Sequence, residues 1–446
     1  MDIGIIGGGL SGLTTAFYIN FFGEGKHKVT VLEREKVVGG KMRTHNENGF
    51  LVEEASNGYL SNRPDTTELV RLAGLDNMLL KSNDNARVRF IYKDKLYKMP
   101  EGVKDFMLSG IMSPLGKLRV ACEYFIPQKK DDKEETLKEF GYRRVGKELT
   151  DTFLDPMVAG VYGSTPDKIA IRASFDKIVM MEQKFGGLIK AMIAMKSKSA
   201  APTGVLMSFK GGCESFVKAL AEKSKADIKL GYEVKSVEKK GDKFVVNGEF
   251  EFDKLIVSTP AYDAANLLGE ILPDAVRRLN AIEYTPISVV GLGYENISHD
   301  LRGFGLLTTT SSKQPILGIV WDSSIFYDRA PENSDILRVM IGGQRDKDLA
   351  LKSDEILTEF AKLGVRNTMG VIDEPKSVYV KRHEKGIPNY GLGHVENVQE
   401  IMKEAKRVNG LYLNSNAYKG VAMNDCIKNS RLTARDVLGL GNELKG

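Results

Sequence analysis

The first twelve residues contain the feature that most constrains the fold. The apolar stretch 3–6 leads directly into Gly7-Gly8-Gly9-Leu10-Ser11-Gly12, and a helical pattern follows. The glycines of such a turn allow a tight bend, a close backbone approach to a phosphate and close packing of helix on strand. We therefore predict a strand at about residues 2–6, a helix at about 10–22 and a strand at about 28–33. This is the βαβ unit of a dinucleotide-binding domain.

A carboxylate at the end of the second strand supports this interpretation. Glu33 lies about twenty positions beyond Gly12, where a carboxylate can accept hydrogen bonds from both ribose hydroxyls of a dinucleotide. The amides and the positive end of the first helix would hold the phosphates. A glycine turn without a ligand and a surface carboxylate are the alternatives.

The next segment favours FAD over NAD. Residues 33–44, EREKVVGGKMRT, resemble the E-x(5)-GG-[RK]-x-x-[ST] segment of the amine-oxidase-like flavoprotein superfamily. In that superfamily the paired glycines let the backbone touch FAD. The resemblance implies FAD contacts at Arg34, Gly40, Lys41 and Met42. A plain loop with a basic tail is the alternative.

The segment 414–430, NSNAYKGVAMNDCIKNS, fits the same superfamily. Its members return at the C-terminus to place a loop and a helix N-terminus against the flavin, and a small apolar surface lets a flat ring pack closely. The resemblance implies contacts at Asn416, Val421, Ala422 and Met423. The segment has no obvious acid or base, which suits hydride transfer to a flavin because that step depends mainly on positioning. An ordinary strand-to-helix connection is the alternative.

Composition excludes several classes of protein. The 446 residues predict two or three domains, and 42% hydrophobic with 28% charged residues is typical of a soluble protein. No apolar run or secretory signal is apparent, so we expect a cytoplasmic protein. The three cysteines lack a CxxC pair and the five histidines lack ligand spacing, so we predict neither a disulfide framework nor a metal site. A net charge of +5 suits an anionic small molecule or an acidic membrane surface and is too small to indicate nucleic acid.

Seven further segments extend the resemblance along nearly the whole chain. In this order they are similar to segments of the protoporphyrinogen oxidases. They read GFLVEEASNGYL (49–60), TTELVRLAGLDNML, RFIYKDKLYKMP (89–100), DPMVAGVYGSTPDKIAI (155–171), GIVWDSSIF (318–326), PNYGLGH (388–394) and YKGVAMNDCI (418–427).

This resemblance implies an α/β (α+β overall) protein with a Rossmann-like FAD-binding domain, a mixed-sheet substrate domain and a helical insertion that associates with the membrane. The helical spacing of apolar residues between 97 and 200 agrees with such an insertion. We expect the FAD-binding domain at 1–80, 201–262 and 391–446, the substrate domain at 81–96 and 263–390, and the helical domain at 97–200.

The implied activity is the six-electron oxidation of protoporphyrinogen IX to protoporphyrin IX in haem biosynthesis, with oxygen or another acceptor reoxidising noncovalent FAD. No side chain would act as a catalytic acid or base. Arg89 would pair with a propionate, as a planar guanidinium can. Gly160 would face the macrocycle, and Leu307 and Phe326 would clamp it. Further FAD contacts would come from Ala55, Ser56, Asn57, Gly58 and Val234.

One departure and several alternatives accompany the resemblance. The family commonly has Gly-Pro where this chain has Ala55-Ser56, which puts the FAD contacts there in doubt. Each substrate residue could instead be surface or core, and Cys426 is expected to be an inert buried thiol rather than a covalent link to FAD. The substrate could be coproporphyrinogen III, which has four carboxylates. A flavin amine oxidase or a non-enzymatic carrier is also possible.

The resemblance also implies partners. They are the porphyrinogen, ferrochelatase or other haem-pathway enzymes, and a second copy of the chain, together with peripheral contact with the cytoplasmic side of a membrane.

Overall fold

The N-terminal βαβ unit has the predicted bounds. The computed structural model describes residues 1–196 and 204–441. In it β1 spans Asp2–Ile6, α1 spans Leu10–Phe22 and β2 spans Lys28–Glu33. β1 and β2 pair in parallel. Both strands are almost fully buried because other elements cover both faces of their sheet, as is usual for parallel sheets.

This parallel sheet has five strands in the order β10-β2-β1-β14-β20. Besides β1 and β2 it contains β10 (Asp227–Leu230), β14 (Lys254–Val257) and β20 (Leu411–Leu413). One apolar cluster joins the sheet to α1, α2 (Asp65–Leu72), α11 (Cys213–Ser224) and α18 (Met423–Leu438). A second cluster joins it to β11 (Val237–Lys240), β12 (Lys243–Val246), β13 (Phe250–Phe252), α12 (Ala261–Leu267), α13 (Pro273–Asn280) and α17 (His394–Arg407).

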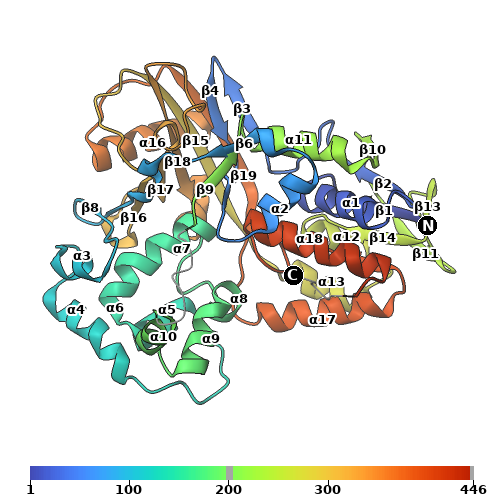
Figure 1. Ribbon diagram of the computed structural model, residues 1–446, viewed down its shortest axis with the longest axis horizontal. Coiled ribbons are helices and arrows are strands. Elements are labelled where there is room, and N and C mark those ends of the chain that lie inside the picture. The colour runs from blue at the N-terminus through green and yellow to red at the C-terminus, as the bar shows by residue number, and fades with distance from the viewer. Residues whose placement is uncertain (197–203, 442–446) are drawn as a thin grey trace.

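A second sheet of seven strands lies beside the first (Figure 1). Its order is β19-β15-β18-β17-β16-β7-β8. One face packs on α16 (Asp354–Met369). Apolar side chains of β15 and β18, Val289 and Ile336, pack instead with Phe50 and Val52. The strands are β7 (Phe90–Tyr92), β8 (Leu96–Lys98), β15 (Tyr284–Glu295), β16 (Gly305–Thr308), β17 (Gly318–Trp321), β18 (Ser334–Gly342) and β19 (Ser377–Pro388).

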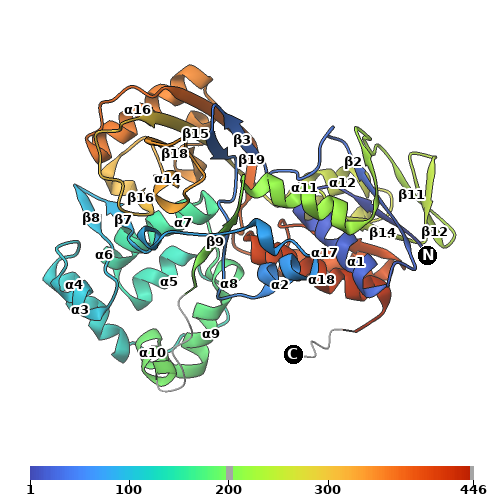
Figure 2. The ribbon, with the colours of Figure 1, turned by 45° about the horizontal axis from the view of Figure 1, so that its top comes forward.

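A group of helices occupies the end of the molecule away from β1 and β2 (Figures 1 and 2). It confirms the predicted helical character of this region. No described helix is long and apolar enough to cross a membrane. The helices are α3 (Val103–Leu108), α4 (Pro114–Ala121), α5 (Leu137–Arg144), α6 (Lys147–Leu149), α7 (Asp155–Tyr162), α8 (Ile171–Ser174), α9 (Asp176–Phe185) and α10 (Leu188–Lys196).

Short elements connect these parts. They are β3 (Thr44–Glu47) paired with β4 (Phe50–Glu53), the small sheet of β5 (Tyr59–Leu60), β9 (Leu206–Phe209) and β6 (Leu79–Lys81), and the helices α14 (Asp322–Ile325) and α15 (Lys347–Ala350).

The predicted division of the chain into domains stays a prediction, and the packing near residue 263 bears on one of its boundaries. The prediction places most of α12 and all of α13 in the substrate domain, but their alanines and leucines pack against β14 and β20 of the first sheet. The change to the second sheet therefore comes later, at β15. The predicted boundary at 200/201 lies outside the described residues.

Candidate functional site

The glycine turn after β1 has the geometry expected for holding phosphates. Gly7 has a φ of +104°, and a Cβ on Gly12 would lie 1.9 Å from the carbonyl oxygen of Gly7. Only glycine therefore fits at either place. No side chain caps α1, whose first residue is Leu10. Its first-turn amides are available to an anion.

Glu33 is anchored at the end of β2, beside this turn. Its Oε2 atom accepts a hydrogen bond from the amide of Gly8 at 2.6 Å, and its Oε1 atom accepts one from the amide of Glu35 at 2.8 Å. Each oxygen keeps a second lone pair, so the carboxylate can still accept hydroxyl donors. Arg34, by contrast, is exposed and lies 3.6 Å from Asp263.

The second glycine pair lies directly on the first turn. Gly39 donates its amide to the carbonyl of Gly8 at 2.8 Å, and a Cβ on Gly40 would lie 3.3 Å from the Cα of Gly9. The two turns are thus in backbone contact, although 30 residues separate them in the sequence. This arrangement supports a shared ligand more strongly than either glycine motif alone.

Lys41 connects this region to the second sheet. Its ammonium group donates to the carbonyls of Lys385 and Gly386 on β19, and burial lowers the pKa of Lys41 to about 8. The neighbouring Met42 is buried.

The C-terminal segment brings a second helix against the first. Gly420 has a φ of +72°, and α18 begins two residues beyond Val421 with Ala422 as its N-cap, without a side-chain cap. Ser430 on α18 donates a hydrogen bond to the carbonyl of Ser11 at 3.0 Å. The helices α1 and α18 lie side by side (Figures 1 and 2). Ala422 is exposed and Asn416 half-buried.

The buried thiol of Cys426 is 8% exposed. Burial raises its pKa to about 12, so the reactive thiolate is scarce at neutral pH. This fits the expected inert role.

The segment 53–58 runs between the glycine turns and α18. The amide of Glu54 donates to the carbonyl of Arg43 at 3.0 Å, and the side chain of Asn424, near the start of α18, donates to the carbonyl of Leu60 at 3.0 Å. Ala55 is exposed, and Ser56 and Asn57 are half-buried. The FAD contacts of Ala55, Ser56 and Asn57 stay a prediction.

Gly58 and Val234 complete the predicted FAD set. Gly58 has a φ of +149°, and a Cβ there would lie 2.0 Å from the carbonyl oxygen of Met207. Val234 is half-buried and follows β10, the strand that pairs with β2. Val234 packs against the second apolar cluster, which includes Ile6 and Leu32, and its FAD contact stays a prediction.

Two of the four predicted substrate residues come together. A Cβ on Gly160, an exposed residue of α7, would lie 2.7 Å from Cδ2 of Leu307 on β16. Arg89 is exposed just before β7, with its guanidinium 5.3 Å from the Phe304 ring centre. Arg89 has no ion pair among the described residues, which leaves it free to meet an anion.

Phe326 does not join this group. Its ring is 0% exposed and packs with Leu80, Ala86 and Ile325, and the Arg329 guanidinium lies 4.9 Å from the ring centre. A contact with substrate would require Phe326 to move.

Sequence reasoning missed the polar residues that hold segment 53–58. Arg338 on β18 and His383 on β19 donate to its carbonyls, and Asp322 on α14 accepts from Asn57. Asp322 lies in the quoted segment GIVWDSSIF, but no local pattern points to its partner. In the part of the chain that the structure describes, no group of His, Cys, Asp or Glu side chains could hold a metal ion.

The family model of flavin-containing amine oxidoreductases matches residues 10–438. The chain belongs to this family. It is a flavin-containing oxidoreductase, and its cofactor is FAD. The glycine turns, the Glu33 carboxylate and the two uncapped helices fit the diphosphate, ribose and flavin parts of this cofactor. When bound, FAD supplies a hydride acceptor.

Several known proteins are similar over almost the whole chain. The coproporphyrinogen III oxidase of Bacillus subtilis (strain 168) is 26% identical over 459 residues, which cover 97% of each chain. The chloroplastic protoporphyrinogen oxidase of Nicotiana tabacum is 26% identical, covering 98% of this chain and 86% of its own. A crystal structure from Exiguobacterium sp. 255-15 superposes with a TM-score of 0.85 at 23% identity, covers 99% of both chains and supports the fold.

Proposed function

We propose that this flavoenzyme oxidises a porphyrinogen to the corresponding porphyrin, a six-electron reaction of haem biosynthesis, with oxygen or another acceptor reoxidising the flavin. The observation that carries the proposal is the end-to-end similarity to porphyrinogen oxidases on a framework that fits FAD. Protoporphyrinogen IX remains the first candidate substrate, because Arg89 is an exposed cation at the predicted propionate position.

Coproporphyrinogen III is the second candidate. The relatives from Bacillus subtilis and Staphylococcus aureus, both named coproporphyrinogen III oxidase, match over 97% or more of their own length, against 86% for the tobacco chloroplast protein. Four carboxylates would require more cations than Arg89 supplies.

An amine oxidase is less well supported. Such an enzyme needs aromatic side chains that frame the substrate beside the flavin. Trp321 instead packs in the apolar cluster between the second sheet and α16, and Tyr418 is 5% exposed. Neither ring offers an open face to a substrate.

The test is an anaerobic titration of the purified FAD-loaded protein with protoporphyrinogen IX, coproporphyrinogen III and a primary amine in separate cuvettes. We expect one or both porphyrinogens to bleach the flavin absorbance and to yield a fluorescent porphyrin, and the ratio of the two rate constants assigns the substrate. A flavin that dithionite bleaches but neither porphyrinogen reduces would overturn the proposal.

We also propose that the helical region makes peripheral contact with the cytoplasmic side of a membrane. Its outer surface carries large apolar side chains that are exposed to solvent. Val103, Leu108, Leu115 and Phe125 are between 73% and 80% exposed. Lys104 is exposed next to Val103, as an interface with anionic lipid would favour.

A further inference from the structure

Segment 53–58 takes hydrogen bonds from side chains of the second sheet in addition to those within its own domain. Nη1 of Arg338 donates to the carbonyls of Glu53 and Ala55 at 3.1 and 2.9 Å. Between them, His383 lies with Nε2 2.8 Å from the carbonyl of Glu54. A carbonyl only accepts, so Nε2 carries the hydrogen. Three consecutive carbonyls of the segment are therefore fixed from one sheet face.

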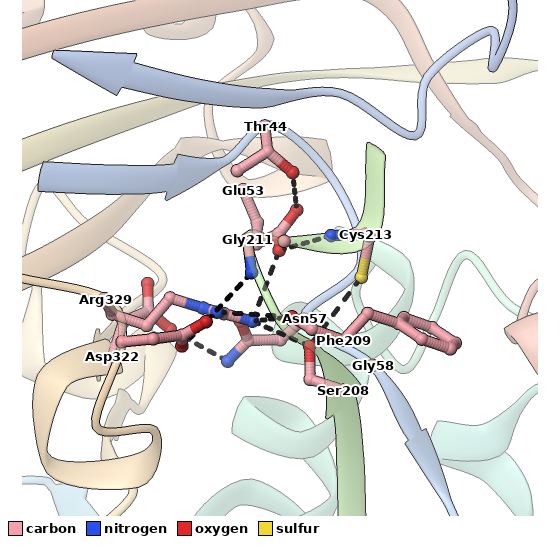
Figure 3. A network of polar contacts seen from close by, with 12 residues as sticks. Thr44, Glu53, Asn57, Gly58, Ser208, Phe209, Gly211, Cys213, Asp322 and Arg329 are labelled. Carbon is pink, nitrogen blue, oxygen red and sulfur yellow. Dashed lines mark hydrogen bonds and ion pairs between the residues drawn. The ribbon is translucent and has the colours of Figure 1, made fainter. Parts of the chain in front are cut away.

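Asp322 completes this arrangement from the other side of Arg338. Its Oδ2 atom accepts from Nε of Arg338 at 2.9 Å, and its Oδ1 atom accepts from Nδ2 of Asn57 at 2.8 Å. Figure 3 shows Asp322 beside Asn57. Arg338 is 4% exposed and Asp322 0%. The buried pair thus holds the segment at positions 53, 55 and 57.

The pair also fixes which way the Asn57 amide points. A carboxylate only accepts, so the NH₂ group of Asn57 must face Asp322. The other end of the amide, Oδ1, is then a buried acceptor without a hydrogen-bond partner among the described residues. A buried carbonyl oxygen is rarely left without a donor. An N–H or O–H group of a bound molecule would supply one.

We propose that Asp322 on α14 and Arg338 on the second sheet are positioning residues that fix segment 53–58, a predicted FAD contact, against the cofactor. Neither residue needs to touch the cofactor. They act through the Ala55 backbone and through the orientation of the Asn57 amide. This inference concerns the cofactor and does not depend on which substrate the enzyme oxidises.

Asp322→Asn is the sharpest test because it changes few atoms. Arg338 Nε and Asn57 Nδ2 are both donors, so the new amide can satisfy only one of them with its oxygen. We expect the Kd for FAD, measured by flavin fluorescence on the refilled apoprotein, to rise about tenfold, which corresponds to about 1.4 kcal/mol. The visible absorption and circular dichroism bands of the bound flavin should shift.

The control is Glu123→Gln, which weakens a comparable buried pair in the helical region, where Glu123 contacts Arg144 and both are 0% exposed. We expect its Tm to fall while the FAD Kd and flavin spectrum remain those of the wild type. Arg338→Lys keeps the charge but cannot reach both carbonyls, and we expect an intermediate rise in Kd.

A wild-type Kd and flavin spectrum in folded Asp322→Asn, with only the Tm lowered, would overturn the proposal by showing that the pair is purely structural. Should Asp322→Asn not fold, Arg338→Lys decides in the same way. None of these measurements uses a porphyrinogen, so failure here and failure of the proposed activity are distinguishable.

Discussion

At the scale of single residues, burial separates the predicted substrate contacts. Arg89 and Gly160 are exposed and Leu307 is half-buried, whereas Phe326 is completely enclosed. An exposed arginine without an ion pair can change the binding of an anion without disturbing the fold. This makes Arg89 the residue at which substrate recognition is best tested.

Arg89→Ala should lower kcat/KM for the preferred porphyrinogen by about 10- to 150-fold, because a charge-assisted bond to a propionate is worth roughly 1.5–3 kcal/mol. Arg89→Lys should recover part of the loss. FAD content should not change. The matched control is Arg302→Ala, whose side chain is 81% exposed and pairs with Asp300. Steady-state kinetics with equal losses in both alanine variants would contradict a specific role for Arg89.

His394 makes stability depend on pH near the C-terminal segment. Its ring is 7% exposed, lies 4.2 Å from that of Tyr390, and its Nε2 is 3.2 Å from the carbonyl of Tyr418. Burial lowers the pKa of His394 to about 4. Between about pH 6.5 and 4 the unfolded chain therefore binds a proton that the folded chain does not, and the free energy of unfolding falls as pH falls.

We expect the wild type to lose about 2 kcal/mol more unfolding free energy than His394→Gln between pH 7 and pH 5, from about 1.4 kcal/mol per pH unit in that window. Urea unfolding of both proteins at the two pH values measures this difference. Equal losses would mean that folding does not lower the pKa of His394.

At the scale of elements, backbone geometry decides how the cofactor region is built. The helices α1 and α18 are held together because Ser430, in the middle of α18, donates to the carbonyl of Ser11 and Asn414 donates to both Thr15 and Ser430. The separation of α1 from β1 is set by Gly12.

Gly12→Ala should disrupt the turn, since the new methyl group would lie 1.9 Å from a backbone oxygen that cannot move without displacing β1. We expect a destabilisation of about 1–3 kcal/mol or more and protein that purifies with little FAD. Gly102→Ala is the control, because nothing lies within 4 Å of its Cβ position. The flavin-to-protein absorbance ratio and the Tm of both variants test this, and normal FAD content in Gly12→Ala would be evidence against the role of the turn.

At the scale of the whole molecule, α3 and α4 lie at the end away from the parallel sheet (Figure 2). These helices and the turn that follows them carry the exposed apolar side chains. Burying one such side chain is worth about 1.5–3 kcal/mol. Leu115 and Phe125, 79% and 80% exposed, would together dominate the attachment to a lipid surface.

The double variant Leu115→Glu/Phe125→Glu should reduce flotation with anionic liposomes by at least about 100-fold in partition coefficient. Ile372→Glu serves as the control, because Ile372 is 77% exposed but lies beyond α16, outside the helical region. Equal recovery of all three proteins with liposomes at low salt would rule out this surface as the contact.

The sequence by itself determined the βαβ unit, the helical region and the two glycine turns. In these places the decisive interactions are local: strand and helix periodicity, the backbone freedom of Gly7, and the steric limit at Gly12. Such constraints act between residues a few positions apart, so a linear pattern reports them.

Only the tertiary structure decided which distant groups meet. In the structure α12 and α13 pack on the first sheet, and Phe326 is buried. Gly160 lies against Leu307, and Arg338 and Asp322 lie at segment 53–58. The physical reason is that a buried arginine or aspartate requires a partner, but many partners would satisfy it equally well. Chain topology selects among them, and it brings Arg338 to the carbonyls of Glu53 and Ala55.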